Sequence, residues 1–346
     1  MTPKDLPNLD VLRSFAVLLV VLAHLIVYQQ WHVHADPLGL TGVCLFFVHT
    51  CLVLMWSLQR DPHTGRFYIR RWFRLFPLWI VVLTLIVLFK IPTSPLAAPH
   101  FGYVAPSLSE YLFNASMLFN LHFGPRIVGA SWSLPLEAQM YILLPLLFFF
   151  IRSTRALWVL LLIDALVIVS VYQAIGFHTT TAATLVLCIP YFLPGVMAYA
   201  LYQKVKPSIP AWIFPLYLAL MALLNSRYGT HFISSLWCLA IGCSLPFFRQ
   251  LSWRPFTQTA HIIARYSYGI YLCHIPSIWI GIHFFQKYGL AAEIPVIAAC
   301  IAILSFTLYH LVEAPMIRFG ARIAKRIDPG PGPRLDQTAL SLEPAP

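Results

Sequence analysis

The chain has 346 residues, of which 59% are hydrophobic and only 10% are charged, and its formal net charge is +11. This composition excludes an ordinary water-soluble domain of that length and predicts a polytopic membrane protein. The excess of basic residues then follows from membrane topology, so it implies no role in nucleic-acid binding.

Ten apolar stretches have about the length needed to cross a bilayer. In chain order they are 9–28, 40–58, 74–91, 134–151, 156–175, 181–203, 211–225, 230–248, 266–286 and 290–312. If the N-terminus is inside, 19 Lys and Arg residues fall on the inner side and 4 on the outer side. The sequence therefore predicts an all-α bundle of about ten transmembrane helices with both termini cytoplasmic. Residues 1–327 form the membrane domain, and 328–346 form a disordered cytoplasmic tail.

The first span contains two costly residues, Arg13 and His24. Eleven positions bring their side chains to within about 20° on one helix face, roughly 16 Å apart along the axis. Ionisable groups inside a membrane segment are candidates for function. The alternatives are an interfacial anchor for Arg13 and a hydrogen bond between helices for His24.

The segment "FYIRRWFRLFPLW", residues 67–79, places Arg71 and Arg74 at the inner end of the third span. Their spacing of three puts both on one helix face, where they could bind phosphate oxygens together. The alternative is a band of interfacial basic residues that follows the positive-inside rule, with Trp72 and Phe73 beside it.

In "SWSLPLEAQMYILLPLL", residues 131–147, Ser133 is the predicted N-cap and Glu137 lies in the first turns of the helix. One interpretation of Glu137 is an interaction with the helix dipole. The alternative is a pair with His24, because Glu137 and His24 are both predicted to lie in the outer half of the membrane.

In "RYSYGIYLCHIPSIW", residues 265–279, His274 is predicted near mid-span with Tyr271 one turn before it, although a Tyr-rich helix can also serve packing alone. Glu313 is predicted to pair with an arginine at the inner end of the last span. No set of His, Asp and Glu has convincing metal-ligand spacing, and His32 with His34 is interpreted as incidental. We therefore expect no metal.

These stretches, in this order, resemble the acyltransferase-3 family of integral-membrane O-acyltransferases. Arg13 and His24 match its opening Arg-x10-His pattern, and Arg71 with Arg74 matches its Arg-x-x-Arg motif. The other stretches are similar to the family's "WSLSVEEQFYLLLPLL", "SYSLYLWHWP" and "E-x-P", and the matched positions are Trp132, Ser133, Glu137, Tyr141, Ser267, Tyr268, Tyr271, Leu272, His274, Pro276, Glu313 and Pro315. Where the family often reads "GVDLFFVLSGF", this chain reads "GVCLFFVHTCL", with Cys44 for the acid and His49-Thr50 for Leu-Ser.

The resemblance implies transfer of an acyl group, usually acetyl, from acyl-CoA to a hydroxyl. Acetyl-CoA is then a cosubstrate, with no permanently bound cofactor. The expected acceptor is a saccharide of a cell-surface or exported glycan, or its lipid-linked precursor, at a bacterial inner membrane. The sequence shows no attached SGNH hydrolase-like domain, which some relatives carry, so we expect the chain to act alone.

Each candidate residue then has a role. Arg13, Arg71 and Arg74 would bind the CoA phosphates, and His24 would act as general base with Glu137 orienting its imidazole. A transient acetyl-histidine is a second route through the same residues. Tyr271 and His274 are candidate oxyanion donors, and Trp132 and Ser133 are further candidates for the acceptor site.

Two other classes of function remain open at this stage. In a proton-coupled secondary transporter, His24, Glu137 and His274 would relay protons and the arginines would bind an anionic or sugar solute. No internal repeat of the kind common in transporters is visible. A binding or scaffold protein of an export complex is the second alternative.

Overall fold

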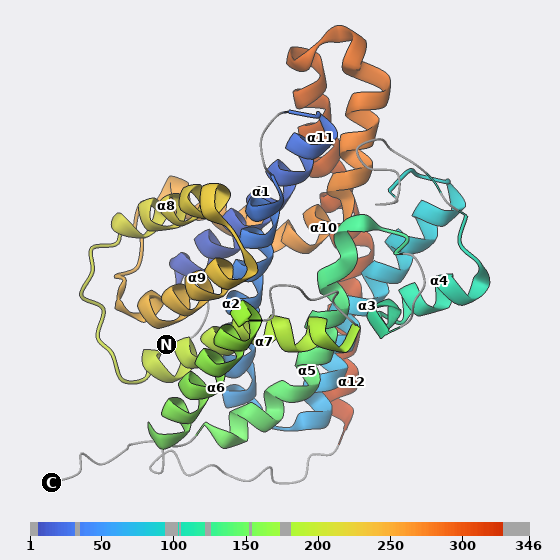
Figure 1. Cartoon of the computed structure of the whole chain (residues 1–346). Helices are drawn as coiled ribbons and strands as arrows, with labels where there is room; N and C mark the ends of the chain where they lie inside the picture. Colours follow the sequence, from blue (N-terminus) through green and yellow to red (C-terminus); the bar gives the residue numbers. More distant parts are fainter. Residues whose placement is uncertain are drawn as a thin grey trace, which may run out of the picture.

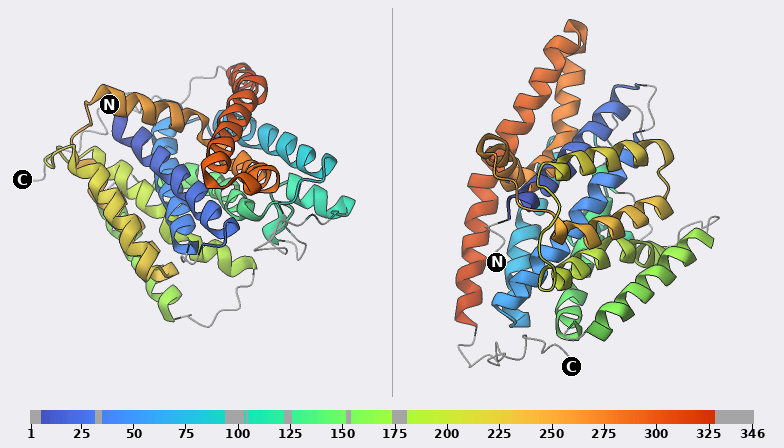
Figure 2. Two further views of the ribbon diagram at one scale, coloured as in Figure 1. Left: turned by 90° about the horizontal axis from the view of Figure 1, so that it is seen from above. Right: turned by 90° about the vertical axis from the view of Figure 1, so that its left-hand side faces the viewer.

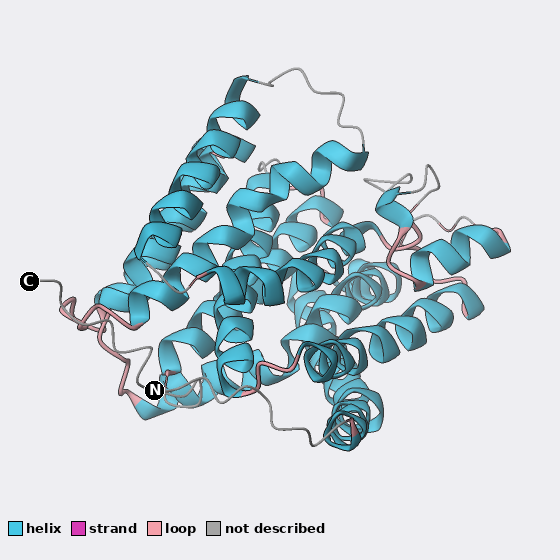
Figure 3. Cartoon of the chain, turned by 90° about the horizontal axis from the view of Figure 1, so that it is seen from below, coloured by secondary structure: helices cyan, strands magenta, loops and turns pink. Residues whose placement is uncertain are grey.

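The computed structural model describes residues 6–31, 35–93, 103, 105–121, 126–151, 154–173 and 181–327. Every regular element in these ranges is a helix, apart from one isolated bridge between Ile209 and Phe248 (Figure 3). The predicted all-α class is confirmed. The predicted tail, 328–346, and His32 and His34 lie outside the described residues.

Long helices occupy all ten predicted spans. They are α1 (Pro7–Tyr28), α2 (Asp36–Arg60), α3 (Thr64–Leu88), α5 (Ser133–Phe150), α6 (Thr154–Gln173), α7 (Thr181–Tyr202), α8 (Ile213–Tyr228), α9 (His231–Ser244), α10 (Arg254–Phe285) and α11 (Leu290–Leu308) (Figure 1). Between α3 and α5, the described part of the chain also forms α4 (Leu108–Ala115) and two 3-10 turns, Phe119–Leu121 and Gly129–Trp132.

Within the described residues, five helices are long and apolar enough to cross a membrane: Pro7–Tyr28, Asp36–Arg60, Thr64–Leu88, Gly129–Phe150 and Leu290–Arg326. They identify the chain as an integral membrane helix bundle. The number of spans and the side of each terminus stay predictions.

Two helices begin well before the predicted spans. α3 starts at Thr64 instead of residue 74, and α10 starts at Arg254 instead of residue 266. Hydropathy marks only the part of a helix that suits the hydrocarbon core, whereas backbone hydrogen bonding continues into the charged interface. His63 supports the early start of α3 because its side chain accepts a hydrogen bond from the backbone N–H of Arg66.

The last helix is longer than predicted. α11 continues through a π-helical turn, Tyr309–Glu313, into α12 (Ala314–Arg326), so one helix runs from Leu290 to Arg326. The right-hand view of Figure 2 shows it along one side of the molecule, and α12 packs against α3. A π turn adds a residue to the helical repeat and redirects the side chains next to it.

α1 packs against both α2 and α10, and α7 packs on the far side of α2. Glycines allow this close approach: a Cβ on Gly42 of α2 would lie 2.6 Å from the carbonyl oxygen of Ala16 in α1. On the other side of α2, a Cβ on Gly195 of α7 would clash with the carbonyl oxygen of Val48. Small residues bring membrane helices together in this way.

α1 and α10 run side by side in the same direction. Near the start of both helices, the Ser14 hydroxyl donates to the carbonyl oxygen of Ala260 at 2.6 Å. Near their other ends, the imidazoles of His24 and His274 are in contact. The functional residues of the two helices therefore form successive levels of one site.

Candidate functional site

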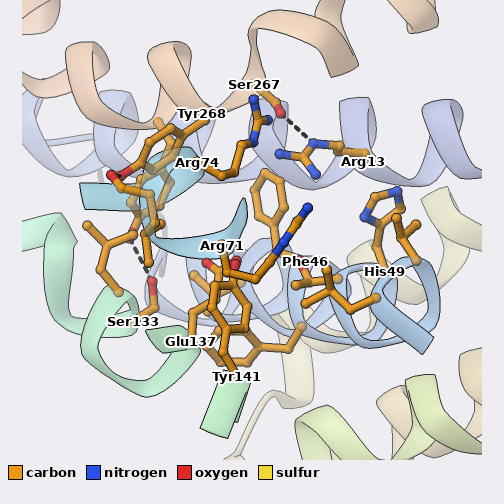
Figure 4. A pocket seen from close by; sticks show the side chains of 18 residues that line it. Arg13, Phe46, His49, Arg71, Arg74, Ser133, Glu137, Tyr141, Ser267 and Tyr268 are labelled. Atoms are coloured by element: carbon orange, nitrogen blue, oxygen red, sulfur yellow. Dashed lines mark hydrogen bonds between the residues drawn. The ribbon is translucent and has the colours of Figure 1, made fainter. Parts of the chain in front are cut away.

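The first pocket lies between α1, α2, α3, α5 and α10 and has an empty volume of about 720 Å³. Arg13, Arg71, Arg74 and Glu137 all line it, so we call it the arginine pocket (Figure 4). The structure thus brings together the predicted donor-binding arginines from two helices that are distant in sequence.

The three arginines of this pocket differ in their partners. Arg13 donates from Nε to the Ser267 hydroxyl at 2.6 Å, and Arg74 forms an ion pair with the fully buried Glu313 at the π turn. This confirms the predicted pairing of Glu313 with an arginine. Arg71 forms neither a hydrogen bond nor an ion pair with the described residues, and its Nε is buried without an acceptor. A guanidinium on a pocket wall whose buried Nε lacks an acceptor among the described residues favours an anionic ligand.

A second pocket, of about 1770 Å³, lies beyond the arginine pocket. His24, Trp132, Asp36, Arg126 and His231 are among the residues that line it, and we call it the histidine pocket. Val43 and Tyr271 belong to the lining of both pockets, so the pockets adjoin there. Along α1, Arg13 faces the first and His24 the second.

A hydrogen-bond network determines the tautomers of His24 and His274. Nδ1 of His274 lies 2.6 Å from the carbonyl oxygen of Tyr271, and Nδ1 of His24 lies 2.9 Å from that of Val20. Carbonyl oxygens only accept, so both Nδ1 atoms carry protons in neutral imidazoles. His274 Nε2, 3.3 Å from His24 Nδ1, is then an acceptor. The network leaves Nε2 of His24 unprotonated and able to accept a proton.

The predicted pairing of Glu137 with His24 is wrong. Glu137 lines the arginine pocket and accepts a hydrogen bond from the Tyr141 hydroxyl at 2.5 Å, whereas His24 lies in the histidine pocket with His274 as its side-chain partner. The prediction inferred equal depth from hydropathy alone. α5 instead presents this carboxylate to the arginines of α1 and α3, where opposite charges attract.

The predicted N-cap is also wrong. α5 begins at Ser133, which is preceded by a 3-10 turn, and its hydroxyl forms no cap. That hydroxyl is 2.8 Å from the Tyr271 hydroxyl, which itself donates to the carbonyl oxygen of Ala130. Ser133 therefore donates to Tyr271 and holds α5 against α10.

The same bonds bear on the predicted oxyanion donors. The Tyr271 hydroxyl proton is directed at Ala130, and the only N–H of neutral His274 is directed at a backbone carbonyl. Neither presents a free donor in this arrangement. Trp132, which was also predicted for this site, lines the histidine pocket, and its indole N–H forms no hydrogen bond with the described residues.

Sequence reasoning missed Asp36, Arg126 and His231, which line the histidine pocket. Asp36 begins α2, Arg126 lies in the long segment before α5, and His231 begins α9. Each stands at a helix end or in a loop, where charged residues are ordinary. No local signal distinguishes them, because only the packing of α2, α7 and α9 brings them to one pocket.

A third pocket, of about 780 Å³, adjoins the arginine pocket through shared Arg13, His49, Val53 and Arg74. Asp10 also lines it, so we call it the Asp10 pocket. His261 and Arg265, in the first half of α10, are exposed and line it as well. The three pockets thus follow one another from an exposed, charged end to the paired histidines.

Comparison with known proteins finds several relatives by sequence. The chain is similar to the O-acetyltransferase OatA of Staphylococcus aureus (strain NCTC 8325 / PS 47), with 27% identity over 368 aligned positions that cover 92% of this chain and 58% of OatA. It is 26% identical over 371 positions to YrhL of Bacillus subtilis (strain 168), a protein named as a candidate peptidoglycan O-acetyltransferase, covering 93% of this chain and 56% of YrhL.

A shorter match, 31% identical over 172 positions, links it to the acyltransferase MdmB of Streptomyces mycarofaciens and covers 44% of this chain and 42% of MdmB. The chain spans somewhat more than half the length of OatA and YrhL. No solved structure matches it. The sequence model described as "Acyltransferase domain" matches residues 6–310, nearly the whole membrane part. The chain therefore belongs to the acyltransferase-3 family.

Proposed function

We propose that this chain is a membrane O-acyltransferase that transfers an acetyl group from acetyl-CoA to a hydroxyl of a saccharide, in an exported or cell-surface glycan or its lipid-linked precursor. Family membership favours this function over the transporter alternative. The acetyl group and the glycan are carried over from what the names of OatA and YrhL state for those proteins.

The observation that carries the proposal is the unprotonated Nε2 of His24 in a pocket that adjoins the arginine pocket at Tyr271. Arg13 and Arg71 would bind the phosphates of the donor. An extended pantetheine arm would then pass Tyr271 and carry the thioester to His24, roughly 16 Å further along α1.

The reaction follows from these positions. His24 Nε2 takes the proton of the acceptor hydroxyl as its oxygen attacks the thioester carbonyl. The C–S bond then breaks, and the imidazolium returns the proton to the leaving CoA thiolate. The carbonyl oxygen of Val20 and Nε2 of His274 share the Nδ1–H of His24 as acceptors, and both keep the ring in the competent tautomer. Trp132, and the guanidinium of Arg126, are donors on this pocket's wall for the transient oxyanion.

The proposal includes a topology: ten spans, both termini cytoplasmic, in the bacterial inner membrane. The parallel course of α1 and α10 supports it, because the first and ninth spans must run in the same direction. The Asp10 pocket would then open toward the cytoplasm, where acetyl-CoA is made, and the histidine pocket would lie toward the outer side.

The test uses purified protein in nanodiscs with acetyl-CoA that carries a radiolabelled acetyl group. We expect saturable binding, slow release of labelled acetate without an acceptor, and faster transfer when glycan fragments are added. A folded wild-type protein that neither binds acetyl-CoA nor releases acetate would refute the proposal, and proton-coupled uptake of solutes would then be measured.

A further inference from the structure

His49 is a buried titratable residue that the proposed reaction does not use. It lies on α2 and lines both the arginine pocket and the Asp10 pocket, and only 5% of its surface is exposed. Figure 4 shows its imidazole on the same side of the arginine pocket as Arg13. It therefore stands at the junction through which a ligand would pass from one pocket to the other.

The imidazole of His49 has no hydrogen-bond partner in the part of the chain that the structure describes. Its Nδ1 is buried without a hydrogen bond to the described residues, although a buried polar group of this kind normally has one. The charged residues that share this junction are Arg13 and Arg74, and guanidinium groups only donate. When Nδ1 of His49 carries the imidazole proton, neither guanidinium can accept it, and a ligand oxygen would supply the missing acceptor.

A second buried nitrogen of the arginine pocket also lacks a hydrogen-bond partner among the described residues. Arg71 Nε is also buried without an acceptor, and it lines the same pocket from α3. Two buried nitrogens that lack a partner among the described residues, one on α2 and one on α3, thus share a pocket with the guanidinium of Arg13. Arg71 Nε is always a donor, and His49 Nδ1 is a donor in the tautomer that carries its proton there. A ligand that satisfies them must present several acceptor oxygens with negative charge, as a phosphate group does.

We propose that His49 binds a phosphate oxygen of the donor's diphosphate, together with Arg13 and Arg71. This inference rests on the proposed function, because it assumes that the donor is an acyl-CoA. The diphosphate is the appropriate group because it is attached to the pantetheine arm. With the diphosphate at the level of Arg13, an extended arm would place the thioester at the level of His24. The family pattern has leucine at this position, so the contact would be a property of this chain.

The test measures dissociation constants of acetyl-CoA and of acetyl-dephospho-CoA, which keeps the diphosphate but lacks the 3′-phosphate. Wild type is compared with His49→Leu, which restores the family residue, and with His49→Asn, whose amide nitrogen can donate from nearly the place of Nδ1. We expect His49→Leu to raise the dissociation constants of both ligands to the same extent, by about ten-fold. His49→Asn should recover most of that loss.

His283→Leu is the matched control, because His283 is exposed near the end of α10 and lines none of the three pockets. It should leave both dissociation constants unchanged. Size-exclusion profiles and unfolding temperatures without ligand establish whether each variant is folded. If His49→Leu does not fold, the affinities of His49→Asn test the proposal instead.

Each outcome has a distinct meaning. Unchanged affinities in folded His49→Leu, with wild type binding both ligands, would overturn the assignment of His49. A loss for acetyl-CoA alone would place the contact at the 3′-phosphate and overturn the diphosphate assignment. If the wild-type protein binds neither ligand, the proposed function itself fails. That result is distinct from a failure of the His49 assignment, in which wild type still binds both ligands.

Discussion

The arginine pocket and the histidine pocket share α1 and α10, yet they offer a ligand different groups: guanidinium groups cluster in the first, whereas the second contains the imidazole of His24. The first contains three guanidinium groups, one of which is paired with a buried carboxylate and one of which has no partner. The second is lined by the imidazole of His24, whose hydrogen bond to His274 behind it is consistent with neutral rings. A charged environment can hold an anionic donor, whereas a general base needs a neutral imidazole. Separating them by about three helical turns lets one protein meet both requirements.

The sharpest way to break this comparison is to remove the base. His24→Ala should reduce acetyl transfer by about 10²- to 10⁴-fold, because proton transfer by a positioned group contributes that much. The dissociation constant of acetyl-CoA should stay the same, since the phosphates would bind in the other pocket. His231→Ala is the control, because His231 lines the same pocket but contacts Tyr191. Weaker binding with normal turnover would contradict the division of roles.

The next comparison is between two arginines of one pocket. Arg74→Ala should lower the free energy of unfolding by about 3–5 kcal/mol, because it leaves Glu313 buried without its cation. Arg71→Ala should have little effect on stability, because Arg71 forms no hydrogen bond or ion pair with the described residues. It should, however, abolish tight acetyl-CoA binding. Thermal unfolding in detergent and ligand binding measure both quantities. If Arg71→Ala and Arg74→Ala lower the free energy of unfolding equally, the proposed division between a ligand-binding and a structural arginine is wrong.

A smaller effect is expected when the base loses its orienting partner. His274→Phe should lower turnover about ten-fold, the equivalent of one hydrogen bond, without changing acetyl-CoA affinity. His274→Gln, whose amide oxygen can accept from Nδ1–H of His24, should recover part of the rate. If both variants are as inactive as His24→Ala, His274 takes part in the chemistry directly.

The smallest effect comes from a charge cluster outside both pockets. Asp61, between α2 and α3, pairs with Arg66 at 2.7 Å and Arg70 at 2.6 Å. Partial burial raises the pKa of this carboxyl, but the hydrogen bonds from Arg66 and Arg70 outweigh it and hold the pKa at about 2, below the ordinary 3.8. The stabilisation is therefore complete above pH 3.8 and is lost as the pH falls toward 2.

Asp61→Asn should lower the free energy of unfolding by no more than about 1 kcal/mol at neutral pH, as for other partly exposed ion pairs. Acetyl-CoA binding and turnover should not change. Thermal unfolding at pH 7 and pH 3 checks this, because the difference between variant and wild type should shrink at the lower pH. A loss of binding would extend the donor site beyond the arginine pocket.

Much of the fold could be predicted from local sequence. Apolar stretches of spanning length located all ten long helices, because helices satisfy their own backbone hydrogen bonds in a membrane. The ends were less accurate: the early starts of α3 and α10 and the extension of α11 through the π turn all lie in charged, polar or mixed sequence. Hydropathy reports burial in lipid and does not report where a helix ends.

The candidate site was predicted unevenly for a similar reason. Helical periodicity alone predicts that Arg13 shares a helix face with His24 and that Arg71 shares one with Arg74. The structure places these residues along one row of adjoining pockets. The pocket that the Glu137 carboxylate lines could not be found in that way. It depends on how α5 is rotated against α1 and α3, which is decided by packing over the whole bundle.

The sequence by itself determined that this is a helical membrane protein, which residues are costly to bury, and which of them share a helix face, because composition and periodicity are local properties. Only the tertiary structure decided that Arg74 is paired while Arg71 and His49 are not, that His274 and not Glu137 contacts His24, and that Arg126 reaches the histidine pocket. Those contacts join residues far apart along the chain, and their energies depend on neighbours that no local pattern specifies.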